Sequence, residues 1–116
     1  MAITILKVSQ LNRYVKSQLE SDPRLKEIYV SGEIGSLSAN QRSGHLYLTL
    51  RDEQSSIKAV MFAGNAACLK FMPQSGLAVV ARGVATLYER DGSFQLNISE
   101  LMLDGAGALG FAFERQ

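Results

Sequence analysis

The sequence predicts a mainly β fold, a five-stranded barrel with an N-terminal helix and a short helix between its third and fourth strands. Apolar and polar residues alternate in the predicted strands, which is the period of a strand with one buried face. Three strands precede the short helix and two follow it. Glycines interrupt two of the long strands, where a barrel needs bulges or sharp bends in order to close.

Length and composition agree with a single globular domain. The 116 residues leave room for one core, and 47% apolar with 20% charged residues argues against disorder. The formal net charge of +1 does not by itself indicate a polyanion partner, although a local group of cations can still attract one. Cys68 is the only cysteine, which excludes an intramolecular disulfide and a cysteine cluster for zinc, and its apolar surroundings predict that it is buried.

The sequence gives no sign of a membrane protein. No apolar run approaches the roughly 18 residues of a membrane span. The N-terminus lacks the order of charged, apolar and small residues that marks a secretory signal. We therefore expect no membrane contact and a cytoplasmic location.

The first predicted element is a helix that begins near residue 9. Four apolar residues recur at helical spacing and form one stripe, namely Val8, Leu11, Val15 and Leu19. Ser9 is the expected N-cap, and Pro23 ends the segment.

Residues 28–34 alternate between apolar and polar side chains and predict the first strand. Gly32 and Gly35 interrupt this alternation and predict a bulge or a bend. The polar residues 36–43 are expected to form the loop that follows.

Residues 44–62 predict two strands joined by a tight turn at residues 52–55, with Arg51 opposite Ser56. One face of this hairpin is apolar and contains Leu46, Leu48, Leu50, Ile57, Ala59 and Met61. The other face mixes aromatic and basic residues and contains His45, Tyr47, Thr49, Arg51, Lys58, Val60 and Phe62. Rings beside cations suit a single nucleic-acid strand, because bases stack on rings while phosphates seek positive charge. The alternative is an amphipathic hairpin whose outer rings lie under a loop or another subunit.

A short helix is expected within residues 64–72, ended by Pro73, and strands at 77–88 and 94–103 complete the chain's regular structure. Asp91-Gly92 in the turn between these strands favours type I′ geometry, and we pair Arg90 with Ser93. This pairing puts Leu87 opposite Leu96 and Ala85 opposite Ile98 on one apolar face, and the other face contains Arg82, Tyr88, Gln95 and Asn97. Tyr88 and Phe94 are expected to be packing residues at this hairpin.

This order of elements is the plan of an OB-fold, which binds oligonucleotides or oligosaccharides on its second and third strands, between the first and last hairpin loops. The residues that we predict to bind nucleic acid are Arg42, His45, Tyr47, Arg51, Lys58, Phe62, Arg82 and Arg90. His45 can either contact a base or turn toward the loop and bond to the backbone. An RNA-binding module of the anticodon-binding type and an architectural oligomerisation domain remain as alternatives.

The sequence indicates no catalytic or metal-binding residue in this segment, and we expect no cofactor. His45 is the only histidine, so no second nitrogen or sulfur ligand has metal-like spacing. Asp52 and Glu53 lie in a predicted turn, where acidic residues are common. Glu33 is expected to have a structural role, bonded to the backbone or to a neighbouring arginine.

Six segments in order resemble the N-terminal part of the large subunits of bacterial exodeoxyribonuclease VII. They are VSQLN at 8–12, VSGEI at 30–34, SGHLY at 43–47 with LRD at 50–52, VMF at 60–62, YERDGSFQL at 88–96 and GAGAL at 105–109. The chain departs from the family pattern at Gly35-Ser36, where Ser-Asn is expected, and at Leu48, where Phe is usual.

The resemblance implies an enzyme that degrades single-stranded DNA to oligonucleotides from either end. It also implies that the large subunit associates with several copies of a small helical subunit, through a region outside this segment. The N-terminal OB-fold is expected to hold the DNA, while the nuclease chemistry belongs to a following domain whose use of metal is left open. We accordingly expect a helical extension at 1–25, the OB-fold domain at 26–104, and a linker with the start of the next domain at 105–116.

Overall fold

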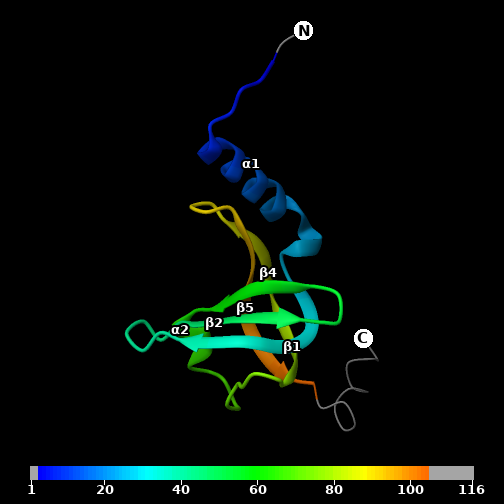
Figure 1. Cartoon of the computed structure of the whole chain (residues 1–116), viewed down its shortest axis with the longest axis vertical. Helices are drawn as coiled ribbons and strands as arrows, with labels where there is room; N and C mark the ends of the chain where they lie inside the picture. The colour runs from blue at the N-terminus through cyan, green and yellow to red at the C-terminus, as the bar shows by residue number, and fades with distance from the viewer. Residues whose placement is uncertain (1–2, 105–116) are drawn as a thin grey trace.

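The computed structural model describes residues 3–104. The elements, in chain order, are α1 (Val8–Ser21), a 3₁₀ turn (Pro23–Leu25), β1 (Ile28–Ala39), β2 (Leu46–Arg51), β3 (Ser56–Met61), α2 (Ala63–Ala66), β4 (Ala78–Tyr88) and β5 (Ser93–Leu103). The strands form a closed barrel in the order β1-β2-β3-β5-β4, with α1 beyond one end (Figure 1). The predicted fold class is confirmed. The predicted linker at 105–116 lies outside the described residues.

The β2–β3 hairpin has the predicted register. Arg51 pairs with Ser56, and Tyr47 pairs with Val60. Inward-facing Leu48 and Leu50 are 3% and 2% exposed, which places the apolar face of the hairpin in the barrel core. Because side chains alternate along a strand, the aromatic and basic residues are directed to the outside of the barrel.

β1 is longer than predicted and bends at the expected glycine. The register between β1 and β2 shifts between Ile34 and Leu37, which marks a bulge. A Cβ atom at Gly35 would lie 2.6 Å from Thr49 Oγ1, so the two strands approach too closely there for a side chain. Beyond the bulge, residues 37–39 pair with β2, so much of the predicted loop at 36–43 belongs to the strand.

The predicted type I′ turn between β4 and β5 is wrong. A type I′ turn needs two residues with positive φ, but in this turn only Gly92 has one, at 72°. The loop contains four residues, its Gly92 N–H donates to Tyr88 O at 2.8 Å, and Tyr88 pairs with Ser93. The predicted pairing of Arg90 with Ser93 is therefore shifted by two residues. Because side chains alternate with a period of two, a shift of the strand pairing by two residues leaves each side chain of β4 and β5 on its predicted face of the hairpin.

The core is formed by inward-facing residues from all five strands. The largest completely buried side chains are Ile34, Leu50, Met61, Val79, Leu96 and Ile98. Gly83 in β4 lies against the backbone of β5, where an added Cβ would collide with Asn97 O. The absence of a side chain at Gly83 therefore allows β4 and β5 to come together at their bulge.

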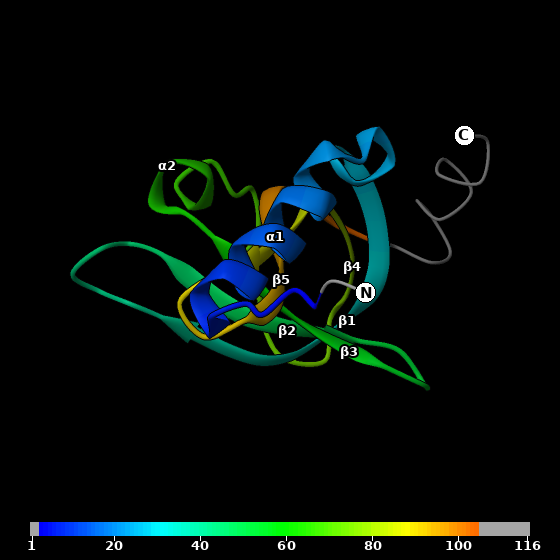
Figure 2. The same cartoon turned by 90° about the horizontal axis from the view of Figure 1, so that it is seen from above.

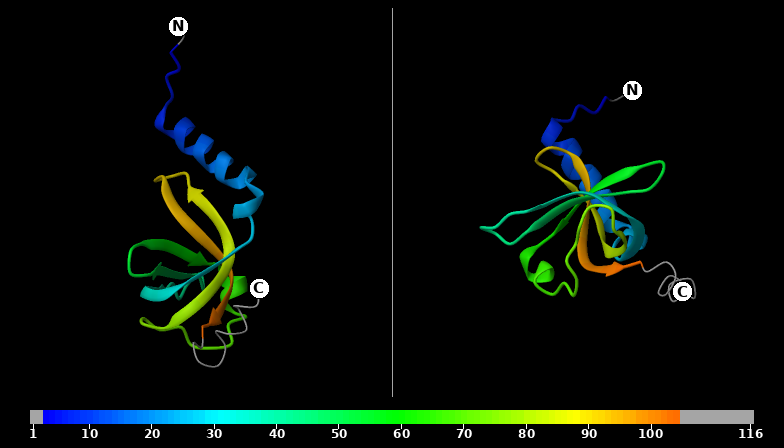
Figure 3. Two further views of the ribbon diagram at one scale, coloured as in Figure 1. Left: turned by 90° about the vertical axis from the view of Figure 1, so that its right-hand side faces the viewer. Right: turned by 60° about the horizontal axis from the view of Figure 1, so that its bottom comes forward.

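The helix α1 crosses the end of the barrel near the tip of the β4–β5 hairpin (Figures 2 and 3). Its N-cap is Lys7 rather than the predicted Ser9, because the Gln10 side chain accepts a hydrogen bond from the Lys7 N–H at 2.8 Å. The predicted apolar stripe remains largely exposed, with Val8 at 76% and Leu11 at 49%. No described helix has the length and apolar character needed to cross a membrane.

The predicted helix at 64–72 is reduced to Ala63–Ala66. After this turn the burial alternates, since Leu69 and Phe71 pack against the core whereas Cys68 and Lys70 are exposed. A helix would place residues two apart on opposite sides, so it cannot bury both Leu69 and Phe71 in this way. The same alternation exposes Cys68, and the prediction that it is buried is wrong.

Candidate nucleic-acid interface

Three rings form an aromatic cluster at one end of the β2–β3 hairpin. The ring of His45 lies edge-on to both neighbours, with centroids 5.1 Å from Phe62 and 6.4 Å from Tyr47. Tyr47 and Phe62 are each 44% exposed. Half-exposed rings held in place by their neighbours can offer a face to a stacked base at low cost in conformational entropy.

His45 is oriented by a hydrogen bond from the backbone. Its Nδ1 accepts from the Ala63 N–H at 3.0 Å, at the first residue of α2. In the neutral ring this bond places the proton on Nε2. The structure thus contains the backbone bond that the sequence left as the alternative, and a ligand contact through the rest of the ring stays a prediction.

Arg42 lies in the loop between β1 and β2, which Asn40 shapes. The Asn40 carboxamide Oδ1 accepts hydrogen bonds from the Arg42 N–H at 2.9 Å and the Ser43 N–H at 3.1 Å. This turn leaves the Arg42 side chain exposed beside the hairpin that carries the aromatic cluster.

Two further cations border the same surface. Lys58 is exposed on β3, where it pairs with Thr49 of β2 on one side and Gln95 of β5 on the other. Arg90 is exposed in the β4–β5 turn. Within residues 3–104, neither of these side chains nor Arg42 forms an ion pair. All three can therefore meet phosphate groups without first breaking an ion pair, although the charge of Lys58, after the bonds from Ser93, helps to lower the pKa of the nearby Asp91.

Arg51 lies on the same face but has a partner. Its Nη2 is 3.5 Å from Glu33 Oε2, and both side chains are about half exposed, at 53% and 46%. This contact is the predicted bond of Glu33 to a neighbouring arginine. A neutralised guanidinium adds little to the local positive potential.

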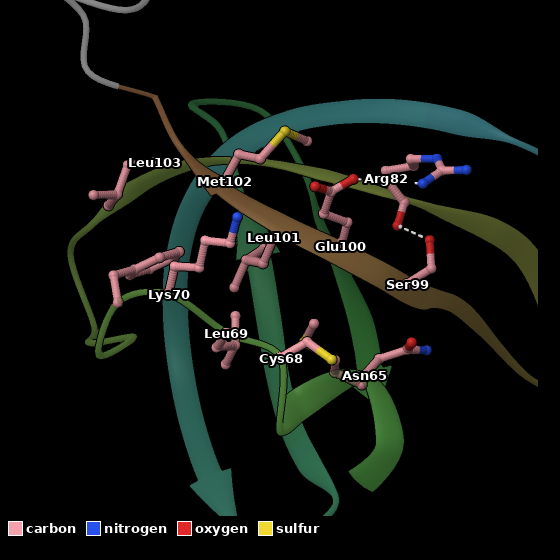
Figure 4. A pocket seen from close by; sticks show the side chains of 12 residues that line it. Asn65, Cys68, Leu69, Lys70, Arg82, Ser99, Glu100, Leu101, Met102 and Leu103 are labelled. Carbon is pink, nitrogen blue, oxygen red and sulfur yellow. Dashed lines mark hydrogen bonds and ion pairs between the residues drawn. The ribbon is translucent and has the colours of Figure 1, made fainter.

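Arg82 is not brought to this surface. It lies on β4, which neighbours β1 and β5 in the closed barrel, whereas the aromatic cluster is carried by β2 and β3. Its guanidinium contacts Glu27 at 2.6 Å and Glu100 at 3.4 Å, and the hydrogen bond to Glu27 raises the pKa of Arg82 above its ordinary value. Arg82 and Glu100 line one side of a groove of about 650 Å³. Figure 4 shows Arg82 beside Glu100 there, with Leu101 and Lys70 farther along the groove.

The acidic turn residues have structural partners. Asp52 Oδ1 accepts hydrogen bonds from the Gln54 and Ser55 N–H groups, each at 2.8 Å, and these bonds lower the pKa of Asp52. In the β4–β5 turn, the hydroxyl and N–H of Ser93 lower the pKa of Asp91. Across the described part of the chain, no three metal-ligating side chains come together.

The parallel pairing of β3 with β5 adds residues that the sequence did not assign to the site. Gln95 and Asn97 pair with Lys58 and Val60, so they continue the outer face beyond β3. Their outward position followed from the alternation along the last strand. Their place beside Lys58 depends on the pairing of β3 with β5, which cannot be inferred from the pattern of residues within either strand.

Comparison with known proteins agrees with this structure. A family model described as an OB-fold nucleic acid binding domain matches residues 6–102. The chain is 48% identical over 111 residues to an exodeoxyribonuclease 7 large subunit from Brevibacillus brevis, which covers 96% of the chain and 24% of the relative. A protein of the same name from Alkaliphilus oremlandii is 45% identical over 115 residues, which covers 99% of the chain and 28% of the relative.

The predicted resemblance to these large subunits is confirmed, and the chain spans only about a quarter of their length. A solved structure described as an aspartyl-tRNA synthetase from Leishmania major Friedlin has a TM-score of 0.57 at 17% identity, over 75% of this chain and 19% of that one. At this identity the likeness concerns the fold alone. The match over residues 6–102 and the closed five-stranded barrel establish that the chain belongs to the family of OB-fold nucleic acid binding domains.

Proposed function

We propose that this chain binds single-stranded DNA on the outer face of β2 and β3, as the N-terminal domain of an exodeoxyribonuclease large subunit. The observation that carries the proposal is the pair of half-exposed rings, Tyr47 and Phe62, on the same face as Lys58. Identity of 45–48% to proteins named exodeoxyribonuclease 7 large subunit supports DNA as the ligand.

A single strand fits this surface better than a duplex. Unpaired bases can leave the stack of their neighbours and lie on protein rings, while the phosphates remain near the cations. Rings and cations read no base edges, so the sequence preference should be slight. One OB domain covers only about 4–16 nucleotides, and we expect weak binding by the chain alone, strengthened where several copies engage one strand.

The remaining expectations about the whole enzyme belong to the same proposal. We place the nuclease chemistry, and any metal that it uses, in the part of the large subunit beyond this segment. The small helical subunit is proposed to associate through that part as well, and the assembled enzyme is proposed to act in the cytoplasm. The chain's limited share of its relatives' length, 24–28%, leaves ample room for these functions.

Fluorescence anisotropy with a labelled single-stranded oligonucleotide tests the proposal. Loss of a stacking ring should cost roughly 1–3 kcal/mol, so Phe62→Ala and Tyr47→Ala should each weaken binding about 5- to 150-fold. Tyr29→Ala is the matched control, because Tyr29 is 62% exposed on β1 and pairs with Arg82, away from β2 and β3. Duplex DNA of the same sequence should bind poorly. Equal affinity of the parent, Phe62→Ala and Tyr47→Ala would refute the assignment of this face.

Two alternatives give different results in companion measurements. An RNA-binding module would prefer RNA in competition with single-stranded DNA of matched sequence. An architectural domain would change its oligomer size in Tyr47→Ala, measured by light scattering, without any change in nucleic-acid binding.

A further inference from the structure

The side chain of His45 joins the loop between β1 and β2 to the start of α2. Its Nδ1 accepts a hydrogen bond from the Ala63 N–H at 3.0 Å, and its ring lies edge-on to Phe62 and Tyr47. We infer that His45 is a positioning residue that holds the aromatic cluster in its binding arrangement only while its ring is neutral, so that acid weakens the binding of single-stranded DNA. The inference rests on the proposed function, because it concerns the regulation of that same site.

His45 supplies a hydrogen-bond acceptor that the start of α2 otherwise lacks. Phe62 is the N-cap residue of α2 and has no polar side chain to accept a bond from the helix. Its carbonyl oxygen accepts from the Asn65 N–H at 2.9 Å and the Ala66 N–H at 2.8 Å. The Ala63 N–H, at the first position of the helix, has no acceptor within the helix and donates to His45 Nδ1. This bond therefore fixes the backbone next to the Phe62 ring.

The loop that carries His45 is held against the same helical turn. The His45 N–H donates to Ser43 Oγ at 3.1 Å, and its carbonyl oxygen accepts from the Asn40 N–H at 2.9 Å. Gly44 has a φ of 80°, and a Cβ added to it would lie 3.1 Å from Ala63 Cβ, so the loop packs closely on α2. With its backbone bonded in the loop and its Nδ1 bonded to α2, the imidazole is held in the orientation that supports the two neighbouring rings.

Protonation of the His45 ring removes the bond to α2. In an imidazolium both nitrogens carry a hydrogen, so Nδ1 becomes a donor that faces the donor N–H of Ala63. The ring must then turn away, which removes its edge from Phe62 and Tyr47 and leaves the Ala63 N–H without this partner. Rings that must be ordered again before a base can stack bind that base less tightly, because the ordering opposes association.

The elements packed around the His45 ring carry few charged or titratable side chains. These are Arg42 in its own loop, Tyr47 and Arg51 on β2, and Lys58 on β3, whereas α2 has none. Arginine, tyrosine and lysine do not ordinarily titrate between about pH 5.5 and 7.5, and histidine does. Since His45 is the only histidine of the chain, a change of DNA affinity over this range reports on its ring.

The direction of the pH effect separates positioning from charge. A histidine that met a phosphate as a cation would strengthen DNA binding in acid, because the added positive charge attracts the strand. A histidine that positions the rings weakens binding in acid in spite of that charge. The loss of one hydrogen bond between neutral groups corresponds to a fall in affinity of about 2- to 10-fold.

The experiment measures anisotropy with one labelled oligo(dT) from about pH 5.5 to 7.5 at constant ionic strength. The affinity of the parent should fall about 2- to 10-fold toward acid. His45→Asn is the matched variant, because its Oδ1 keeps an acceptor but does not titrate, and its pH profile should be flat. His45→Phe keeps a ring without an acceptor, so it should bind more weakly than the parent at pH 7.5 and show no pH dependence.

A second measurement follows the bond without DNA. In proton–nitrogen NMR spectra, the Ala63 amide signal of the parent should shift over the same pH range, because its acceptor is lost. In His45→Asn this signal should stay constant. Circular dichroism at each pH checks that the barrel remains folded.

The inference is overturned if the affinity of the parent rises or stays constant toward acid, or if His45→Asn shows the same fall as the parent. It is also overturned if the Ala63 signal does not respond to pH, or if His45→Phe binds as tightly as the parent at pH 7.5. In each case weaker binding by Phe62→Ala at pH 7.5 would leave the proposed function intact. If Phe62→Ala and Tyr47→Ala both bind like the parent at every pH, the proposed function itself fails.

Discussion

The salt dependence of DNA binding follows from which cations on the barrel are free. Five basic residues were predicted to meet phosphates, but Arg51 is paired with Glu33, and Arg82 is engaged by glutamates away from β2 and β3. The residues that remain are Arg42, Lys58 and Arg90. We therefore predict the effect of removing Lys58, of releasing Arg51 by Glu33→Gln, and of removing Arg82.

Each phosphate neutralised on a single strand contributes about −0.7 to the slope of log K against log salt concentration. Three free cations give a slope of about −2 for the parent. Lys58→Ala should reduce its magnitude to about 1.4, whereas Glu33→Gln should increase it to about 2.8, because Arg51 then becomes available. Arg82→Ala should leave the slope unchanged.

The assay is anisotropy with one labelled oligo(dT), titrated at several concentrations of a monovalent salt. Circular dichroism of each variant checks that the barrel remains folded. A slope that changes in Arg82→Ala and stays constant in Lys58→Ala would refute the assignment of the binding face to β2 and β3. A slope that does not increase in Glu33→Gln would show that Arg51 meets a phosphate despite its carboxylate partner.

Two further predictions concern stability. Gly83→Ala should lower the free energy of unfolding by about 1–3 kcal/mol or more, measured by urea denaturation, because the added Cβ would collide with Asn97 O. Gly64→Ala is the control. A Cβ added at Gly64 would meet no other part of the chain within 4 Å, so this variant should be neutral or slightly stabilising. Asp52 contributes stability through its lowered pKa, fully present above the ordinary value of 3.8 and lost as the pH falls through the lowered value. Asp52→Asn should lack this acid-dependent loss in urea denaturation across pH 2–5, and identical pH profiles of parent and variant would contradict the stated role.

Local patterns were sufficient where neighbouring parts of the chain interact. The turn at residues 52–55 fixes the pairing of Arg51 with Ser56, and alternation then assigns every side chain of β2 and β3 to a face. The bulge near Gly35 was likewise expected, because glycine inside a strand indicates close approach of another strand. In the last hairpin the predicted register was shifted by two residues, yet the faces were right, because alternation has a period of two.

Local patterns failed where distant contacts decide. The helical spacing predicted the apolar stripe of α1 but not its surroundings, because α1 is tied to the β4–β5 turn by polar contacts of Asn12 and Lys16 with Glu89, while Val8 remains exposed. The predicted helix after β3 is short, since burying Leu69 and Phe71 against the core requires an extended chain.

The sequence by itself determined the barrel, its inward and outward sets of residues, and the rings of the β2–β3 hairpin, because these follow from side-chain period and from turns a few residues long. The tertiary structure alone decided which cations are free. Glu33 reaches Arg51 and Glu100 reaches Arg82 through the pairing of consecutive strands, whereas Glu27 reaches Arg82 because β1 pairs with β4 where the barrel closes. Closure also set Gln95 beside Lys58, and a hydrogen bond from Asn12 of α1 reaches Glu89 O, 77 positions away in the chain.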